Sequence, residues 1–343
     1  MRRRALIAAT SLAALGRVVT GLGEFAELAM PRAGDGLLPS RLSMSHVQAV
    51  EAVTDRLRTV VRQYGGQAEV FGTAAKHYAR WMGVSAVAAV QTRLGCALAE
   101  LHTEAGWACY DSGVDGSGYF TRALRFADDA GDGFGIGNAA WHAGVSLVRS
   151  GHPNDALKCF QLGQLSIGGR FQPGKTTPAT LRADDPRMPT LTARLNRHSA
   201  TAYALLGLSD QAKSHLAKAN DGWVPRNAFE RGGMELATAG VELDLGRFDT
   251  AESFAAGAVR NYGDVHGRGR TAAELTLAEV HVRSGEPRGL VLARQALDAA
   301  SVLQSVAVRR ERVQPLAEAL AARPGSDARE LARMARQVAT TVV

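Results

Sequence analysis

One segment of the sequence matches the phosphate-binding pattern GxxxxGK[ST]. It runs from Gly169 through Lys175 to Thr176. In nucleotide-binding proteins this loop follows a buried strand and opens a helix, so that its backbone N–H groups converge on the phosphates. Here a predicted helix precedes the segment, and Pro178 falls within what would be the first helical turn. We therefore interpret residues 168–187, rich in Gly, Pro and Thr, as an inserted basic loop and expect no nucleotide cofactor.

The nine histidines offer imidazole groups that could bind a metal or act as general bases. They include His102, His142, His198 and His281, and none belongs to an HExxH pair or to a Cys/His ligand spacing. The sequence also contains no GxSxG nucleophile motif. It therefore predicts a protein that is not an enzyme, with no catalytic residues, no bound metal and no cofactor.

A different set of side chains is suited to holding a partner. Trp and Tyr provide apolar anchors, while Asn and Arg bind the backbone or the carboxylates of an extended peptide. Each of these side chains lies on the first helix of a predicted helix pair, on the side that we expect to line a concave groove. The predicted groove residues are Glu100, Thr103, Trp107, Tyr110, Asn138, Trp141, Arg194 and Arg197. In the alternative interpretation, Trp107 and Trp141 only pack between adjacent helices, as large aromatic residues usually do.

The elements that must position these side chains are helices that end at regularly spaced glycines. Successive gaps between the glycines are 38, 56, 39 and 39 residues, and the glycines are Gly113, Gly151, Gly207, Gly246 and Gly285. A period near 39 predicts stacked helix pairs. The long second gap contains the segment 168–187, and removing that insertion nearly restores the period. Glycine can adopt the left-handed conformation that ends a helix.

Other positions repeat together with the glycines. Seven residues before each glycine the side chain is small, and the residues are Gly106, Gly144, Ala200, Ala239 and Ala278. Two helices cross closely only where side chains are minimal, so these positions predict the crossing point of each pair. The small residues that follow the glycine in the other blocks align in the first and last blocks only with an insertion before Ala123 and a one-residue deletion before Gly289. Chance agreement in an alanine-rich chain is the alternative interpretation.

This register, together with helix caps and helical periodicity, predicts a series of paired helices. Their expected ranges are 45–63, 67–81, 85–112, 116–130, 134–150, 153–166, 188–206, 209–220, 227–245, 248–261, 268–284, 287–304, 306–322 and 325–340. The run from Ser45 to Gln48 has the form of a capping box for the first helix. The predicted fold is all-α, a tetratricopeptide-like α-solenoid of stacked helix pairs over residues 45–343, preceded by an apolar and basic segment, residues 1–44.

The most distinctive sequence segment is ELHTEAGWACYDSG, from Glu100 to Gly113, followed by YFTRALRFA and by AGD at residues 130–132. It resembles the tetratricopeptide regulatory half of actinobacterial transcription regulators that carry a Cro/repressor-type helix-turn-helix at their N-terminus. The resemblance covers roughly residues 45–320 and is most specific over 104–132. It implies a DNA-binding domain before the repeats, whereas only about 44 residues precede them here. The chain is then either a stand-alone regulator acting through protein partners or the regulatory half of a DNA-binding regulator.

Composition and charge fit a helical protein that binds proteins. Aromatic residues make up only 6 % of the chain, and the three cysteines have no CxxC spacing, as expected for small-residue helix packing in a reducing compartment. The net charge of +7 is spread along the chain, so we expect no direct nucleic-acid binding. The expected partner is a peptide or protein, and self-association is left open.

The first 16 residues imitate a signal peptide, with a basic start followed by an apolar stretch. Arg17 interrupts the pattern, no convincing cleavage site follows, and the stretch is too short to span a bilayer. We therefore expect a cytoplasmic protein that does not contact a membrane, with an exported repeat protein as the alternative.

Overall fold

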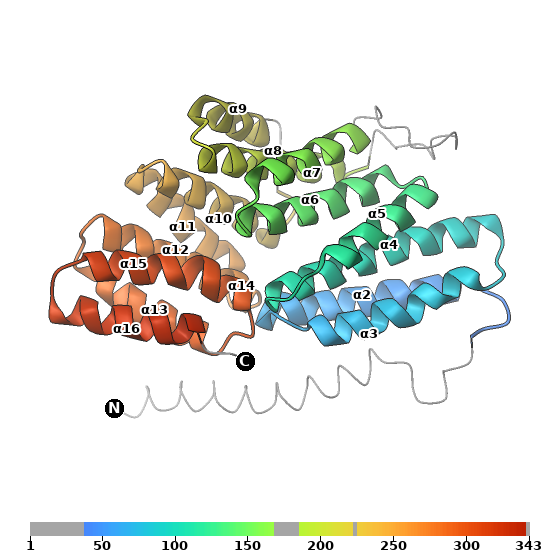
Figure 1. Ribbon diagram of the computed structural model, residues 1–343, viewed down its shortest axis with the longest axis horizontal. Coiled ribbons are helices and arrows are strands. Elements are labelled where there is room, and N and C mark those ends of the chain that lie inside the picture. Colours follow the sequence, from blue (N-terminus) through green and yellow to red (C-terminus); the bar gives the residue numbers. More distant parts are fainter. Residues whose placement is uncertain (1–37, 168–184, 222–224, 341–343) are drawn as a thin grey trace.

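A computed structural model of the protein describes residues 38–167, 185–221 and 225–340. Every regular element within these ranges is helical, which confirms the predicted all-α fold (Figure 1). Most of the predicted N-terminal segment 1–44, most of the inserted loop and the whole GxxxxGK[ST] match lie outside the described residues. No described helix combines the length and the apolar character that crossing a membrane requires.

The helix boundaries lie within a few residues of those predicted. The elements are α2 (Met44–Tyr64), α3 (Ala68–Ala79), η1 (Arg80–Gly83), α4 (Ala88–Asp111), α5 (Ser117–Asp129), α6 (Gly133–Arg149), α7 (Pro153–Ile167), α8 (Met188–Leu205), α9 (Ser209–Asn220), α10 (Ala228–Asp244), α11 (Phe248–Tyr262), α12 (Gly267–Arg283), α13 (Arg288–Ser301), α14 (Val306–Val308), η2 (Arg309–Val313), α15 (Gln314–Ala322) and α16 (Ser326–Thr340). Two details differ from the prediction. The helix expected over 306–322 is interrupted by a π-helical turn, η2. The cap of α2 is Ser43, whose backbone N–H donates to Nδ1 of His46, two residues earlier than predicted.

The regularly spaced glycines end helices as expected. The φ angles of Gly113, Gly151, Gly207, Gly246 and Gly285 all lie between +73° and +84°. After each of them the next N–H bonds to the carbonyl five residues back, as Val114 does to Cys109 at 2.9 Å. This is the Schellman arrangement, which satisfies carbonyl groups that the helix end would leave unpaired.

The small residues lie where the helices of a pair cross. A Cβ added to Gly106 would lie 2.7 Å from Cε1 of Phe120, and Ala200, Ala239 and Ala278 are 0 % exposed. Ala123, which follows the insertion, and Ala293, four residues after Gly289, are also 0 % exposed. The small residues of the repeat pattern therefore occupy packing positions between helices.

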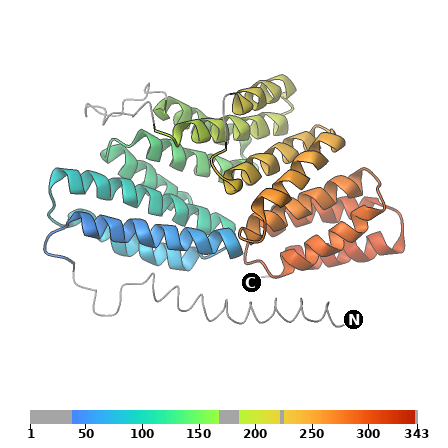
Figure 2. The same ribbon diagram turned by 180° about the vertical axis from the view of Figure 1, so that it is seen from behind.

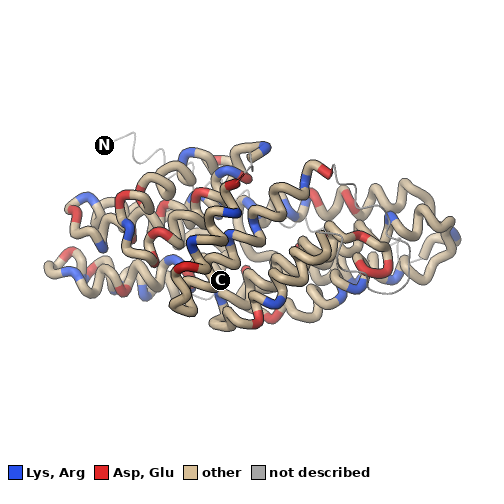
Figure 3. The backbone as a smooth tube through the Cα atoms, turned by 90° about the horizontal axis from the view of Figure 1, so that it is seen from above, with Lys and Arg blue, Asp and Glu red and all other residues tan. Residues whose placement is uncertain are grey.

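Six helices form a closed inner ring. Helices α2, α4, α6, α8, α10 and α12 contact one another in that order, and α12 returns to contact α2. Helices α5, α7 and α11 each pack against the first helix of their own pair and against the first helix of the next pair. Figures 1 and 2 show the resulting arch, whose N-terminal and C-terminal helices meet. Basic and acidic positions are interspersed along the whole array (Figure 3).

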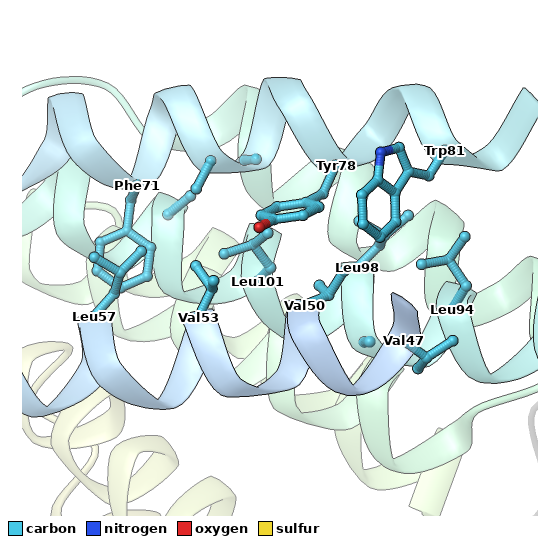
Figure 4. Packing of buried hydrophobic residues seen from close by; sticks show 14 of the residues in the cluster. Val47, Val50, Val53, Leu57, Phe71, Tyr78, Trp81, Leu94, Leu98 and Leu101 are labelled. Carbon is cyan, nitrogen blue, oxygen red and sulfur yellow. The ribbon is translucent and has the colours of Figure 1, made fainter. Parts of the chain in front are cut away.

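The largest apolar cores lie at the two ends of the array. In the N-terminal core, α2, α3, η1 and α4 bury their apolar faces against one another. Figure 4 shows the packed side chains of Val47, Val50, Val53, Leu57, Phe71, Tyr78, Trp81, Leu94, Leu98 and Leu101. Each fully buried side chain of this size contributes roughly 1.5–3 kcal/mol to folding. The two ends of the array are therefore well-packed segments.

The crossing point at Gly106 predicts opposite effects for one substitution at two sites. Gly106→Ala should lower the free energy of unfolding by about 1–3 kcal/mol, because the added methyl group overlaps the buried Phe120 ring. Gly118→Ala, in the first turn of α5 with no atom within 4 Å of the added Cβ, should be neutral or stabilising by up to about 1 kcal/mol. Urea unfolding measures both changes. Equal effects at the two sites would contradict the assigned packing.

Candidate functional site

The ring closes on the buried carboxylate of Asp111, at the end of α4. Asp111 is 0 % exposed. Its oxygens accept hydrogen bonds from Nε of Arg268 at 2.9 Å, the hydroxyl of Ser305 at 2.7 Å and the backbone N–H of Gly66 at 2.8 Å. One side chain thus joins α4 to α12, to the loop before α14 and to the loop between α2 and α3. A buried carboxylate with these partners holds the two ends of the array together.

Backbone contacts surround this carboxylate. The N–H of Gln304 donates to the carbonyl of Tyr64 at 3.0 Å, and the N–H of Gly267 donates to Oε1 of Gln63 at 3.0 Å. A Cβ on Gly65 would lie 2.7 Å from Cβ of Ser305, so the two loops meet without room for a side chain there. We call this set of contacts around Asp111 the junction.

Next to the junction, Trp107 of α4 lies at the centre of a cluster of aromatic and cationic groups. Its ring is 5.2 Å from that of Tyr110 and 5.5 Å from that of His142. The guanidinium carbons of Arg149 and Arg268 lie 5.8 and 5.7 Å from its centroid. Cations within about 6 Å of an indole face are attracted to it. The cluster therefore brings α4, α6 and α12 together on the inner ring.

Trp141 of α6 continues the cluster toward α8. Its ring lies 4.3 Å from that of His142, and the guanidinium carbon of Arg194 lies 5.0 Å from its centroid. Nδ1 of His198 is 3.1 Å from Nε1 of Trp141 and 2.9 Å from the carbonyl oxygen of Arg194. A neutral Nδ1 either accepts from the indole or donates to the carbonyl, so it satisfies one of these groups at a time.

The structure brings four of the predicted groove residues together. Trp107, Tyr110, Trp141 and Arg194 all belong to this aromatic–arginine cluster. Trp107, Trp141 and Arg194 keep part of their surface exposed, whereas Tyr110 is only 5 % exposed. Its hydroxyl has no hydrogen-bond partner among the described residues, and the guanidinium carbon of Arg310 lies 5.7 Å from its ring centroid.

The other predicted groove residues lie elsewhere. Arg197, expected beside Arg194, is 2 % exposed and donates to Oδ1 of Asn220 at 3.1 Å, so it packs between α8 and α9. Thr103 is 1 % exposed and donates its hydroxyl to the carbonyl of Ala99. Glu100 is exposed and accepts from Arg58 of α2 at 2.6 Å. Asn138 is partly buried on α6. The predicted Arg194–Arg197 pair on one surface is therefore wrong.

Sequence reasoning missed four members of the cluster: Arg149, Arg268, His142 and His198. His142 and His198 occupy the same position in their repeats: His142 directly follows Trp141, and His198 lies four residues after Arg194. A predicted inner face that included this neighbouring position would have contained both histidines. Arg149 stands at the last residue of α6. Arg268 lies in the first turn of α12 and reaches α4 only because the ring closes.

The inner cations are only partly neutralised. Arg149 lies 3.0 Å from Glu311 of η2. Burial disfavours both charges: it lowers the pKa of Arg149 to about 9, with repulsion from Arg312 and Arg268, and it raises the pKa of Glu311 to about 8. The charge of Arg312 opposes the rise at Glu311, and the charge of Asp111 opposes the fall at Arg149. Burial, joined by repulsion from Arg62, also lowers the pKa of Arg194.

The two cluster histidines are neutral at physiological pH. Burial lowers the pKa of His142 to about 4, although the charge of Glu104 opposes the shift. Burial also lowers the pKa of His198 to about 3, and the nearby charge of Arg149 adds to that effect. The cluster therefore presents uncharged imidazoles and indoles together with guanidinium groups, a combination that binds apolar and anionic groups.

A second cluster, at Glu252, His281 and Glu286, has ligand atoms within 4.8 Å of one another. Arg288 lies among them, with Nη2 2.7 Å from Nε2 of His281 and an ion pair to Glu286 at 3.2 Å. A guanidinium group therefore occupies the place that a metal cation would take.

Neither known protein families nor curated proteins match this sequence.

Removing the charge of Asp111 should weaken the closed ring. Asp111→Asn leaves the Arg268 guanidinium without its carboxylate, and breaking a buried ion pair in this way costs about 3–5 kcal/mol. The matched control is Asp129→Asn at the exposed end of α5, which should change stability by less than about 0.5 kcal/mol. Urea unfolding compares the two variants. A small loss of unfolding free energy in Asp111→Asn would show that the junction contributes little to stability.

Acidification should destabilise the protein through His142 and His198. The unfolded imidazoles titrate near 6.5 and the folded ones near 4 and 3, so the unfolded state binds more protons between these values. Stability should therefore fall as the pH drops below about 6.5. Urea unfolding at about pH 7.5 and about pH 5 should show this fall, and it should be smaller in His142→Gln/His198→Gln. An imidazole of either residue that titrates near 6.5 by NMR would contradict these environments.

Proposed function

We propose that this protein is a non-enzymatic, cytoplasmic regulatory protein that holds a peptide or protein partner on the inner face of a tetratricopeptide-like array. The repeat register supports the tetratricopeptide-like description. Helix-ending glycines with positive φ, and small crossing residues seven positions before them, recur in five consecutive blocks. The resemblance of residues 104–132 to the regulatory half of actinobacterial regulators points in the same direction.

The aromatic–arginine cluster is the observation that carries the proposal. It draws on side chains from four elements of the inner ring, α4, α6, α8 and α12. Trp and Arg are the side chains most often responsible for binding energy at protein interfaces, because they combine a large apolar area with directional polar groups. Rigid helices hold Trp107, Trp141 and Arg194 in place, so a partner gains contacts without first ordering a loop.

The same cluster touches the junction. α4 carries both Trp107 and Asp111, and Arg268 lies over the Trp107 ring while it bonds to Asp111. A partner that displaces Arg268 from Trp107 would therefore also alter the contact that closes the ring. This shared residue gives the array a route by which partner binding changes its curvature, which is the output expected of a regulatory repeat protein.

The proposal predicts that the inner tryptophans dominate binding. Full-length protein would be used to select peptides from a random display library, and the selected peptides would be titrated by calorimetry. Trp141→Ala should weaken their binding by about 30-fold or more, as truncation of a central anchor residue does.

The matched control is Tyr203→Ala. Tyr203 is a partly buried aromatic residue on the same helix as Arg194, but its ring packs 5.2 Å from His215 of α9. This variant should bind the selected peptides as the parent does. Equal losses in both variants, with each folded by circular dichroism, would place the binding surface elsewhere. Failure of the parent protein to select any peptide would remove the proposal.

A further inference from the structure

A closed circuit of contacts lies beside the junction and joins α4, α6 and η2. It begins at Tyr110, whose ring lies 5.2 Å from that of Trp107. The guanidinium carbon of Arg149 lies 5.8 Å from the Trp107 ring, and its Nη1 lies 3.0 Å from Oε2 of Glu311. Nη2 of Arg310 lies 3.9 Å from Oε1 of Glu311, and its guanidinium carbon is 5.7 Å from the Tyr110 ring. These five side chains, which we call the circuit, therefore lie together in one region of the inner ring.

The short helix α14 brings η2 to the end of α4. A Cβ added to Gly113, just after α4, would lie 2.8 Å from Cγ1 of Val306 in α14, so the two segments pack closely. The π-helical turn η2 follows α14 directly and carries both Arg310 and Glu311. Turns of this kind are rare and occur frequently at functional sites. This turn places one charged side chain against Tyr110 of α4 and the next against α6.

Two polar atoms of the circuit are buried without a hydrogen-bond partner among the described residues. They are the hydroxyl oxygen of Tyr110, a residue only 5 % exposed, and Oε1 of Glu311, whose side chain is 13 % exposed. Arg310 does not satisfy Glu311, because 3.9 Å exceeds the reach of a hydrogen bond. An unpaired buried polar group is costly, so native proteins normally pair it with a ligand or with water.

The charges of the circuit disfavour a charged ligand. An ammonium group at Oε1 of Glu311 would meet the guanidinium groups of Arg149 and Arg310, which lie 3.0 and 3.9 Å from oxygens of the same carboxyl group. A carboxylate or a phosphate at that place would meet the oxygens of Glu311 themselves. A neutral group that offers both a donor and an acceptor avoids both repulsions, because the Tyr110 hydroxyl can donate and Oε1 of Glu311 can accept.

We propose that the hydroxyl of Tyr110 and the carboxyl group of Glu311 form a binding site for a primary carboxamide, the side chain of an Asn or Gln residue of the partner peptide. The amide N–H donates to Oε1 of Glu311, and the amide carbonyl accepts from the hydroxyl of Tyr110. The partly exposed Trp107 packs against the carbons that carry the amide. Arg310, whose side chain is 45 % exposed, moves off the Tyr110 ring to admit the amide. This inference rests on the proposed function and specifies its ligand.

The Tyr110 hydroxyl can be tested without a peptide. Tyr110→Phe should leave the urea midpoint of unfolding unchanged, because the hydroxyl has no partner among the described residues. The matched comparison is Ser305→Ala, which removes a fully buried hydroxyl that donates to Asp111 at 2.7 Å and should lower the midpoint. A midpoint of Tyr110→Phe as low as that of Ser305→Ala would give the hydroxyl a structural role and overturn the inference.

Ligand chemistry is tested with synthetic peptide pools of one random scaffold, in which one position is fixed as Gln, Asn, Met or Glu. The full-length protein should bind the Gln or the Asn pool about tenfold more tightly than the Met pool, because Met fills similar space without the two hydrogen bonds. The tighter of the two amide pools identifies the side chain. A preference for Glu over both amides would indicate an anion site and overturn the inference.

A methyl ester separates the two contacts, because it keeps the carbonyl oxygen of the amide and lacks the N–H donors. The ester pool carries the γ-methyl ester of Glu, or the β-methyl ester of Asp where Asn binds more tightly. Burial raises the pKa of Glu311 to about 8, so the titrations are run at about pH 8.5, where the carboxylate predominates. The amide pool should then bind about fivefold more tightly than the ester pool. Equal binding of the two pools would overturn the contact with Glu311.

The contact with the hydroxyl is tested in Tyr110→Phe with the same pools. The ester pool should bind this variant no more tightly than the Met pool, because the donor to the carbonyl is gone. The control is Tyr203→Phe on α8, whose ring lies 5.2 Å from that of His215, and it should bind every pool as the parent does. An unchanged preference for the ester over Met in Tyr110→Phe would overturn the role of the hydroxyl.

Two results separate this inference from the proposed function. If all pools bind equally, the carboxamide site is overturned and peptide binding stands. If no pool binds, the proposed function fails and the carboxamide site fails with it.

Discussion

The buried carboxylate of Asp111 is the contact on which the inner ring depends. Helix pairs that repeat along a chain normally contact only their neighbours, and their stability is then a sum of local terms. Here the loop after α2, the end of α4, the start of α12 and the loop before α14 share one carboxylate. Non-neighbouring parts of the array are thereby joined directly by hydrogen bonds.

Closure also decides the electrostatics of the interior. Arg149 of α6 and Arg268 of α12 come from elements far apart in the sequence, and both lie near the Trp107 ring because α12 returns to α2. Water is partly excluded there, which lowers the pKa of His142 and His198 and keeps both imidazoles neutral. The guanidinium groups of Arg149 and Arg268 lie near the Trp107 ring, and that of Arg194 lies near the Trp141 ring.

Local features of the fold could be predicted from the sequence because their causes are local. A glycine ends a helix wherever the chain must turn left-handed, and a small residue must stand where two helices cross, so the boundaries and Gly106 were identifiable. The site was only partly predictable. One repeat register was applied to every block, yet Arg197 turns toward α9 while Trp141 of the equivalent position faces the ring. The role of Arg268 depends on closure, which a repeat pattern does not encode.

Closure can be measured directly by hydrogen exchange at three backbone amides. The N–H groups of Gly66, Gly267 and Gln304 bond across the junction, to Asp111, Gln63 and Tyr64. Each lies in a loop or at the start of a helix, so its protection comes from the junction and not from a helix interior. If the ring is closed in solution, these amides exchange as slowly as amides within α4 and α12. Exchange at the rate of an unstructured peptide, with the helices still protected, would contradict a closed ring.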